Sequence, residues 1–205
     1  MSGFVYASGG SAEFNETFGK ALEGYAAEVR KALVRRGSRN ALAGLVLCGG
    51  YGRGEGAVCR RPVPGRPGEI LETAYNDVDI LPVAKAAGIQ ALAEALADCE
   101  SLRRDFEERW HADLDIGRPV EAHALSRFPA SLMWIEVARG HRVLEGPEDL
   151  FLGAVSFDPD APVPVSEAAR LLLNRGTGLL MAAMKARGNP PAAYDTGDPD
   201  FIRRN

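Results

Sequence analysis

Residues 77–80 read Asp77-Val78-Asp79-Ile80, a pair of carboxylates that alternates with apolar side chains. In a β-strand, successive side chains point to opposite faces, so Asp77 and Asp79 share one face, about 6.5–7 Å apart. Val78 and Ile80 then point into the core. Neighbouring carboxylates repel each other unless a cation neutralises them, so the pattern favours bound Mg²⁺ or Mn²⁺. The competing interpretation is a solvated strand face, or a turn at the start of the strand.

Upstream of this strand, an apolar run ends in two glycines. The run from Ala41 to Cys48 predicts a buried strand that leads directly into Gly49-Gly50. Glycine has no Cβ, so the backbone there approaches a ligand closely, and a helix that starts at this point offers free N–H groups to phosphate. Because glycine pairs after strands are more often ordinary turns, this feature alone favours the structural interpretation.

A third acidic position lies downstream. Leu114-Asp115-Ile116 places an acid between two apolar residues, at the start of a predicted extended stretch from Leu114 to Leu125. Asp113 and Glu121 compete for the same role, and Glu121 has the same local pattern as Asp115. Taken alone, each of these acids is most simply a surface residue at the end of a strand.

Together the three pieces resemble the nucleotidyltransferase superfamily, in its small bacterial type with a DNA polymerase beta-like fold. The family pattern is glycine followed by glycine or serine, then two acids flanking an apolar strand residue, then an isolated acid between apolar residues. Gly49-Gly50, Asp77-Val78-Asp79 and Leu114-Asp115-Ile116 match these parts in order. Tyr51 and Arg53 also fit the Gly-Ser-Tyr-x-Arg-Gly-Glu variant of small bacterial members. The resemblance covers roughly residues 40–146.

The resemblance implies an α/β (α+β) fold: a mixed sheet with flanking helices, followed by the start of a helical C-terminal region. Two departures from the family pattern stand out. The stretch between Gly50 and Asp77 is longer than the usual loop, and its segment from Arg60 to Gly68 is predicted to be an irregular, inserted loop. Gly50 also stands where serine is commoner, which removes a hydroxyl that would touch phosphate.

For the metal site, the resemblance implies that Asp77 and Asp79 bind two catalytic ions, Mg²⁺ or Mn²⁺. Asp115 would complete the coordination of one of them. The metal near Asp115 would lower the pKa of an attacking hydroxyl, while the other would neutralise the triphosphate. Asp115 is also the candidate general base for the hydroxyl proton.

For the nucleotide, the resemblance implies a nucleoside triphosphate lying over Gly49 and Gly50, with ATP as the expected substrate. Tyr51 and Arg53 are assigned to the same side of the site. Arg53 is expected to reach a phosphate oxygen, and a surface ion pair is the simpler alternative for this arginine.

Three functions are weighed. The leading one is metal-dependent transfer of a nucleotide, AMP from ATP, onto a hydroxyl of a small molecule or protein. The second is a catalytically inactive module of the same fold that senses nucleotides or binds a protein. The third, an unrelated phosphate-ester hydrolase, needs a nucleophile, and its only candidate, Cys48, is expected to be buried and inert.

The segments on either side of the acidic and glycine motifs predict helices, and the chain as a whole predicts two domains. A nucleotidyltransferase domain over residues 1–160 is predicted to begin with a helix at 11–36, capped by Ser11, and to contain helices at 89–110 and 130–139 and an extended piece at 143–144. Residues 161–205 are predicted to be a linker and a helix over 166–187. Leucines cover more than one face of that helix. It is therefore expected either to begin a helical domain that is cut short or to pack on a partner. That partner is another protein or a second copy of the chain.

Composition limits the partners and the cellular location that the chain is expected to have. With 205 residues and 46% hydrophobic content, the chain builds a packed core, and its net charge of −4 argues against a general nucleic-acid surface. No apolar run approaches the ~20 residues that span a bilayer, and the first residues lack a signal-peptide pattern. Three cysteines without metal-type spacing are expected to be reduced thiols, so a cytoplasmic location is expected.

Overall fold

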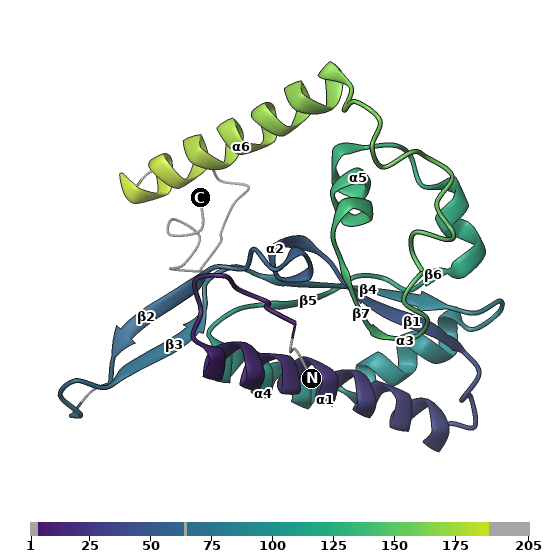
Figure 1. Cartoon of the computed structure of the whole chain (residues 1–205), viewed down its shortest axis with the longest axis horizontal. Helices are drawn as coiled ribbons and strands as arrows, with labels where there is room; N and C mark the ends of the chain where they lie inside the picture. Colours follow the sequence, from purple (N-terminus) through teal and green to yellow (C-terminus); the bar gives the residue numbers. More distant parts are fainter. Residues whose placement is uncertain (1–3, 64, 189–205) are drawn as a thin grey trace. The chain divides into compact units, whose positions relative to one another are not determined.

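The computed structural model describes residues 4–63 and 65–188, which form two compact units (Figure 1). The first unit comprises the chain up to Pro129 and the segment Met133–Asp160. The second comprises Ala130–Leu132 and the chain from Ala161 onward. Of the predicted C-terminal segment, residues 189–205 lie outside the described residues.

A mixed sheet forms the centre of the first unit. Its strands are β1 (Leu42–Leu47), β4 (Val78–Ala84), β5 (Leu114–Ile116), β6 (Val120–Glu121) and β7 (Arg142–Glu145). The order is β5-β4-β1-β7, with β6 also paired to β4. β1 runs antiparallel to β4 and β7, whereas β5 and β6 run parallel to β4. The mixed α/β architecture expected from the sequence is confirmed.

Helices cover both faces of this sheet. Along one face lie α1 (Ala12–Arg35), α3 (Ile89–Asp98) and α4 (Glu100–Trp110), as Figure 1 shows. They bury the even-numbered β4 residues Val78 and Ile80. Side chains of the 3-10 helix η1 (Ala122–Arg127) and of α5 (Leu132–Arg139) bury Leu81 and Val83 on the other face. Alternation along β4 therefore supplies a core on each side.

Helix α1 agrees with the prediction. The Ser11 hydroxyl accepts a hydrogen bond from the Phe14 amide at 3.0 Å, and Gly37 at φ +68° follows the last turn. The Ser11 cap is therefore the one predicted, and glycine at a positive φ is a common end of a helix. The helix buries apolar residues that recur every three or four positions: Phe14, Phe18, Leu22, Tyr25, Val29 and Leu33.

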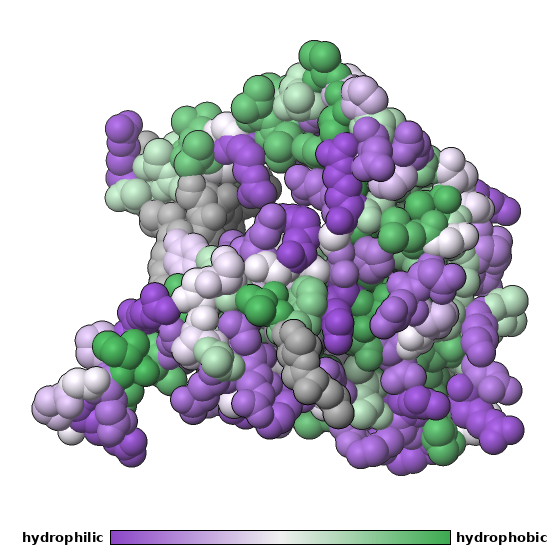
Figure 2. Space-filling view, in the orientation of Figure 1, coloured by the Kyte–Doolittle hydropathy of each residue, from purple (hydrophilic) through white to green (hydrophobic). Residues whose placement is uncertain are grey.

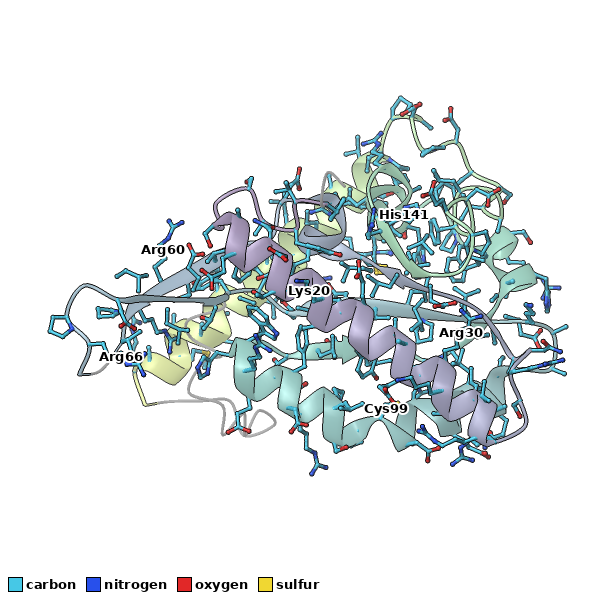
Figure 3. All side chains as sticks on the ribbon, turned by 60° about the horizontal axis from the view of Figure 1, so that its bottom comes forward. Lys20, Arg30, Arg60, Arg66, Cys99 and His141 are labelled. Atoms are coloured by element: carbon cyan, nitrogen blue, oxygen red, sulfur yellow. The ribbon has the colours of Figure 1, made fainter. Side chains whose placement is uncertain are left out.

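The single helix predicted over residues 89–110 is wrong, because the chain breaks at Cys99. Cys99 adopts φ −95° and ψ 9°, ends α3 and precedes α4, and Figure 3 labels it at this junction. The break changes which residues face inward. Leu102 is 38% exposed, whereas Phe106 and Trp110 are buried in α4.

The irregular loop predicted over residues 60–68 is also wrong in part. Strands β2 (Val58–Pro62) and β3 (Ile70–Ala74) pair antiparallel as a separate two-stranded hairpin. The glycines that suggested a loop, Gly65 and Gly68, lie between the strands at positive φ. Figure 3 shows Arg60 and Arg66 on this hairpin, where each bonds a nearby glutamate. Pairing between distant residues overrode the local composition.

The extended stretch predicted over residues 114–125 is divided. β5 stops at Ile116, and the Gly117 amide still donates to Ile80 O of β4 at 2.9 Å. β6 follows after Pro119, and η1 begins at Ala122. Leu125, predicted to be extended, is therefore a buried residue of the 3-10 helix.

The second unit contains α6 (Val165–Ala186), close to the predicted helix. Its leucines lie on several faces, and Figure 2 shows apolar residues gathered along it. Leu172 and Leu173, for example, are more than 70% exposed. None of the described helices, α6 included, has the length and apolarity needed to cross a membrane.

Candidate metal centre

Strand register brings the acids of β4 and β5 together. β5 runs parallel to β4 with Asp115 paired directly to Asp79, and adjacent strands are about 4.8 Å apart. Val78 and Leu114 are fully buried on the face that α1, α3 and α4 cover, so alternation places Asp79 and Asp115 on the opposite face. Asp77 lies just before β4, and its carboxylate joins theirs. The same-face arrangement of Asp77 and Asp79 follows from the sequence, whereas the approach of Asp115 follows from the register.

The three carboxylates form a compact oxygen cluster. One oxygen from each of Asp77, Asp79 and Asp115 lies within 4.8 Å of the others; Asp77 and Asp115 are exposed and Asp79 is half-buried. Two oxygens on opposite sides of one Mg²⁺ ion are about 4.2 Å apart. Small rotations of the exposed side chains reach this spacing, and hard carboxylate oxygens are the ligands that Mg²⁺ and Mn²⁺ prefer. The residues present therefore fit a divalent cation.

The register also separates the three candidates for the third acid. Glu121 pairs with Ala84, five residues along β4 from Asp79, which is roughly 16 Å at the rise of a strand. Its carboxylate bonds the Ala87 amide and His123. Within the part of the chain that the structure describes, Asp113 is likewise not in the cluster. Asp115 is the acid that joins Asp77 and Asp79.

The electrostatics of the cluster centre on Asp79. Burial, with smaller contributions from the charges of Asp77 and Asp115, raises the pKa of Asp79 from 3.8 to about 6. Three carboxylates around one point repel one another, and a cation bound between them would reverse this effect. The raised pKa therefore identifies Asp79 as the acid with most to gain from a bound metal.

Gly49 keeps the space beside Asp79 open. It begins the short helix α2 (Gly49–Arg53) at φ +65°, in the left-handed region that favours glycine. A Cβ at this position would lie 2.5 Å from Asp79 Oδ2. The Cys48 amide donates to the Asp79 carbonyl at 2.8 Å, which ties the turn to β4. Only glycine lets the chain pass the carboxylate this closely.

The other residues assigned to the nucleotide have different surroundings. A Cβ added at Gly50 would meet Glu55 O at 3.6 Å, an ordinary van der Waals contact, so this position does not require glycine for space. Tyr51 is 1% exposed, with its ring against Phe18 in the core. The Arg53 guanidinium bonds Glu55 at 2.9 Å and lies 3.9 Å from Glu136. The ion-pair alternative for Arg53 is thus the observed arrangement.

Cys48 is not arranged as a nucleophile. It is buried, and burial, followed by the charge of Asp79, raises the pKa of its thiol to about 12. The thiolate is the reactive form, so a thiol with this pKa is inert near neutral pH. The burial expected for Cys48, directly after β1, is confirmed.

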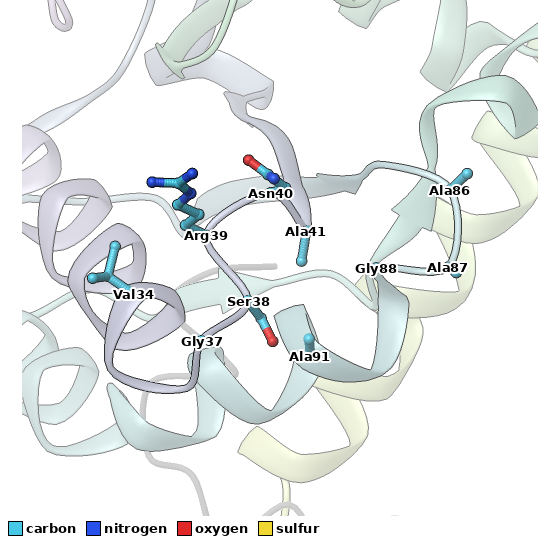
Figure 4. A pocket seen from close by; sticks show the side chains of 10 residues that line it. All are labelled: Val34, Gly37, Ser38, Arg39, Asn40, Ala41, Ala86, Ala87, Gly88 and Ala91. Carbon is cyan, nitrogen blue, oxygen red and sulfur yellow. The ribbon is translucent and has the colours of Figure 1, made fainter.

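A separate concavity lies at the other end of β1 and β4, between the segments 37–41 and 86–91 (Figure 4). The antiparallel register pairs Leu42 with Ala84 at this end and Leu47 with Ile80 at the acidic end. Small residues, mainly alanine and glycine, line it, and none of the three clustered acids does. It therefore belongs to a different part of the surface from the metal centre.

Mg²⁺ is expected to stabilise the protein strongly at pH 7.5 and weakly at pH 5. Because the pKa of Asp79 is about 6 in the folded state, against an ordinary value of 3.8 for an aspartate, the neutral carboxyl favours folding below pH 4. That contribution is lost as the pH rises through 6, and the ionised form then binds the cation. Mg²⁺ at 100 times its Kd adds about 2.7 kcal/mol to the free energy of unfolding, which raises Tm by about 5–10 °C.

Thermal melts followed by circular dichroism test this expectation, with NaCl of equal ionic strength as the control. A Mg²⁺ shift of the same size at both pH values would contradict it.

Comparison with models of known protein families, with curated proteins and with solved structures finds no match to this chain. The geometry of the site has three elements: an oxygen cluster from β4, β5 and the residue just before β4, a half-buried acid with a raised pKa, and a glycine that leaves that acid open.

Proposed function

We propose that this protein is a metal-dependent nucleotidyltransferase that moves AMP from ATP onto a hydroxyl of a small molecule or protein. The observation that supports this most is the convergence of Asp77, Asp79 and Asp115 within 4.8 Å. These are the three acids that match the pattern of the nucleotidyltransferase superfamily. The order of the elements, a strand ending in Gly49-Gly50 beside the strand of paired acids, agrees with the same resemblance.

In the proposed reaction, the acceptor oxygen attacks the α-phosphorus of ATP and pyrophosphate leaves. Asp77, Asp79 and Asp115 would hold Mg²⁺, which would neutralise charge on the triphosphate and activate the hydroxyl. Asp115, whose side chain is exposed, would take the hydroxyl proton. Gly49 leaves room for the triphosphate next to Asp79.

The inactive module remains a second candidate because of one observation. Arg53, the cation expected to contact phosphate, is ion-paired with Glu55 and lies 3.9 Å from Glu136. Those partners reduce its attraction for a triphosphate. A protein that binds the metal and the nucleotide without converting the nucleotide would retain the acid cluster and tolerate this ion pair.

We expect pyrophosphate release from ATP that depends on Mg²⁺, measured with a coupled phosphate assay across the four nucleoside triphosphates and a set of hydroxyl compounds. Label transfer from ATP carrying α-phosphorus-32 then identifies the acceptor. Calorimetry on the same samples separates the candidates. Nucleotide binding that needs Mg²⁺ but gives no pyrophosphate supports the inactive module, and absence of such binding rejects both.

A further inference from the structure

Tyr51 has a role that its place next to the glycine turn does not reveal. It is the third residue of α2, yet its ring is almost fully buried, with its centroid 4.9 Å from that of Phe18. The ring passes so close to Gly56 that a Cβ there would lie 2.1 Å from Tyr51 Cδ1. The glycine at position 56 therefore makes room for the ring, and α2 is anchored to the core through Tyr51.

The Tyr51 hydroxyl joins the two ends of the hairpin. It donates to the Ala57 carbonyl at 2.6 Å and accepts from the Tyr75 amide at 3.1 Å. Ala57 immediately precedes β2, and Tyr75 immediately follows β3. The Tyr75 amide also reaches Ala57 O at 3.1 Å, so the three groups form one small network. One buried hydroxyl thus closes the base of the hairpin.

This network lies next to the segment that carries Asp77. One residue separates Tyr75 from Asp77, and β4 begins only at Val78. On the far side, the Val78 amide donates to Asp113 O at 2.8 Å. The backbone of Asp77 is therefore held between a bond to the sheet edge and the bond from Tyr75 to Tyr51.

We infer that the Tyr51 hydroxyl is a positioning residue for Asp77, which sets the exposed acid of the metal centre against Asp79. The inference rests on the metal site of the proposed function. Tyr51 itself does not bind the metal, because its side chain is buried in the core; it acts through the backbone of residues 75–77. Groups that orient metal ligands in this way typically change metal affinity by 10- to 100-fold when removed.

The electrostatics agree with this placement. Burial raises the pKa of the Tyr51 hydroxyl, the backbone amides of Tyr75 and Asn76 oppose part of the rise, and the charge of Asp77 adds to it. Amides of two successive residues before Asp77 thus act on the same oxygen. The carboxylate they precede is close enough to contribute as well.

The test is the affinity of the full chain for Mn²⁺, measured by calorimetry, in the wild type and in Tyr51→Phe. The substitution keeps the ring against Phe18 and removes the hydroxyl, so we expect Kd for Mn²⁺ to rise about tenfold. Tyr25→Phe is the matched control. Tyr25 is another buried tyrosine, but the titratable groups around its hydroxyl are Cys99, Arg103, Glu100 and Glu107, outside the cluster. Its Kd for Mn²⁺ should equal that of the wild type.

Three outcomes are distinguished. A raised Kd in Tyr51→Phe and an unchanged Kd in Tyr25→Phe support the inference. Equal affinity of Tyr51→Phe and the wild type overturns the inference and leaves the proposed function intact. A wild type that binds no Mn²⁺ overturns both.

A measurement on the wild type alone covers the case in which Tyr51→Phe fails to fold. Coupling between two sites is reciprocal, so a bond that strengthens metal binding is itself strengthened when the metal binds. Mn²⁺ is paramagnetic, so Mg²⁺ is used, and hydrogen exchange of the Tyr75 amide is followed by NMR. Exchange slowed about tenfold by saturating Mg²⁺ supports the inference, and exchange at an unchanged rate overturns it.

Discussion

Replacing Asp79 with Asn is expected to lower Mg²⁺-dependent pyrophosphate release about a thousandfold and, at pH 7.5 without metal, to raise Tm. The loss of rate follows because a catalytic metal is worth several kcal/mol of transition-state stabilisation, and each ~1.4 kcal/mol is a factor of ten. Asp79 is the half-buried member of the cluster and the strand partner of Asp115. Removing its charge therefore removes the centre of the site.

The expected rise in Tm without metal comes from removing the same negative charge. The folded state raises the pKa of Asp79 to about 6, so at pH 7.5 the ionised carboxylate opposes folding. A neutral amide of the same shape removes that opposition. Below pH 4, where the wild-type carboxyl is also neutral, the difference in Tm between the two proteins should disappear. A simple loss of structure predicts the reverse, a lower Tm at every pH.

Asp105→Asn is the control for this substitution. Asp105 is an exposed acid on α4 and lies outside the cluster, so its variant should keep both the rate and the Mg²⁺ shift of Tm. Rate measurements and melts over pH 4–8 on the two variants and the wild type provide the comparison. An Asp79→Asn protein that still releases pyrophosphate at a tenth of the wild-type rate would refute the metal centre.

Replacing Gly49 with Ala is expected to reduce the rate about a hundredfold and to raise Kd for Mn²⁺ at least tenfold. The added Cβ would lie 2.5 Å from Asp79 Oδ2, well inside van der Waals contact, so the carboxylate has to move. A displacement of about 1 Å at a reacting site is enough for a loss of this size. The positive φ of residue 49 adds roughly 1–2 kcal/mol of destabilisation.

Gly37→Ala separates the two effects. Gly37 has φ +68°, nearly the same as Gly49 at +65°, but nothing lies within 4 Å of an added Cβ. Both variants should lose similar stability from the backbone conformation, and only Gly49→Ala should lose metal affinity. Denaturant melts and Mn²⁺ calorimetry on the pair measure the two quantities separately. If both variants bind Mn²⁺ like the wild type, Gly49 does not keep Asp79 accessible.

Local patterns predicted much of the fold. The apolar spacing and the Ser11 cap gave the position of α1 to within one residue at each end, because both signals come from neighbours in the chain. The same reasoning failed at Cys99, where the helix predicted over 89–110 breaks, since nothing in the apolar spacing marks the change of direction. It also failed at the hairpin, whose strands β2 and β3 stabilise each other across a turn.

In the candidate site, too, local patterns predicted some features and missed others. Alternation was sufficient to predict that Asp77 and Asp79 lie together, although β4 begins only at Val78 and Asp77 directly precedes it. Tyr51 was assigned to the nucleotide side because it fits the Gly-Ser-Tyr-x-Arg-Gly-Glu variant of the family pattern, but its side chain is in the core and its hydroxyl bonds Ala57 and Tyr75. Its partners are 6 and 24 residues away, a separation that motif spacing does not encode.

The sequence by itself determined that Asp77 and Asp79 lie on the same side, because alternation has a period of two residues. It also determined where the backbone can approach a neighbour closely, because Gly49 has no Cβ. Both are local properties of the chain. Only the tertiary structure decided that Asp115, and not Glu121, completes the cluster. That choice depends on the register between β4 and β5, which arises from pairing between residues 36 positions apart, Asp79 and Asp115. Register is fixed by burial across the whole sheet, so a local pattern shared by Asp115 and Glu121 could not distinguish them.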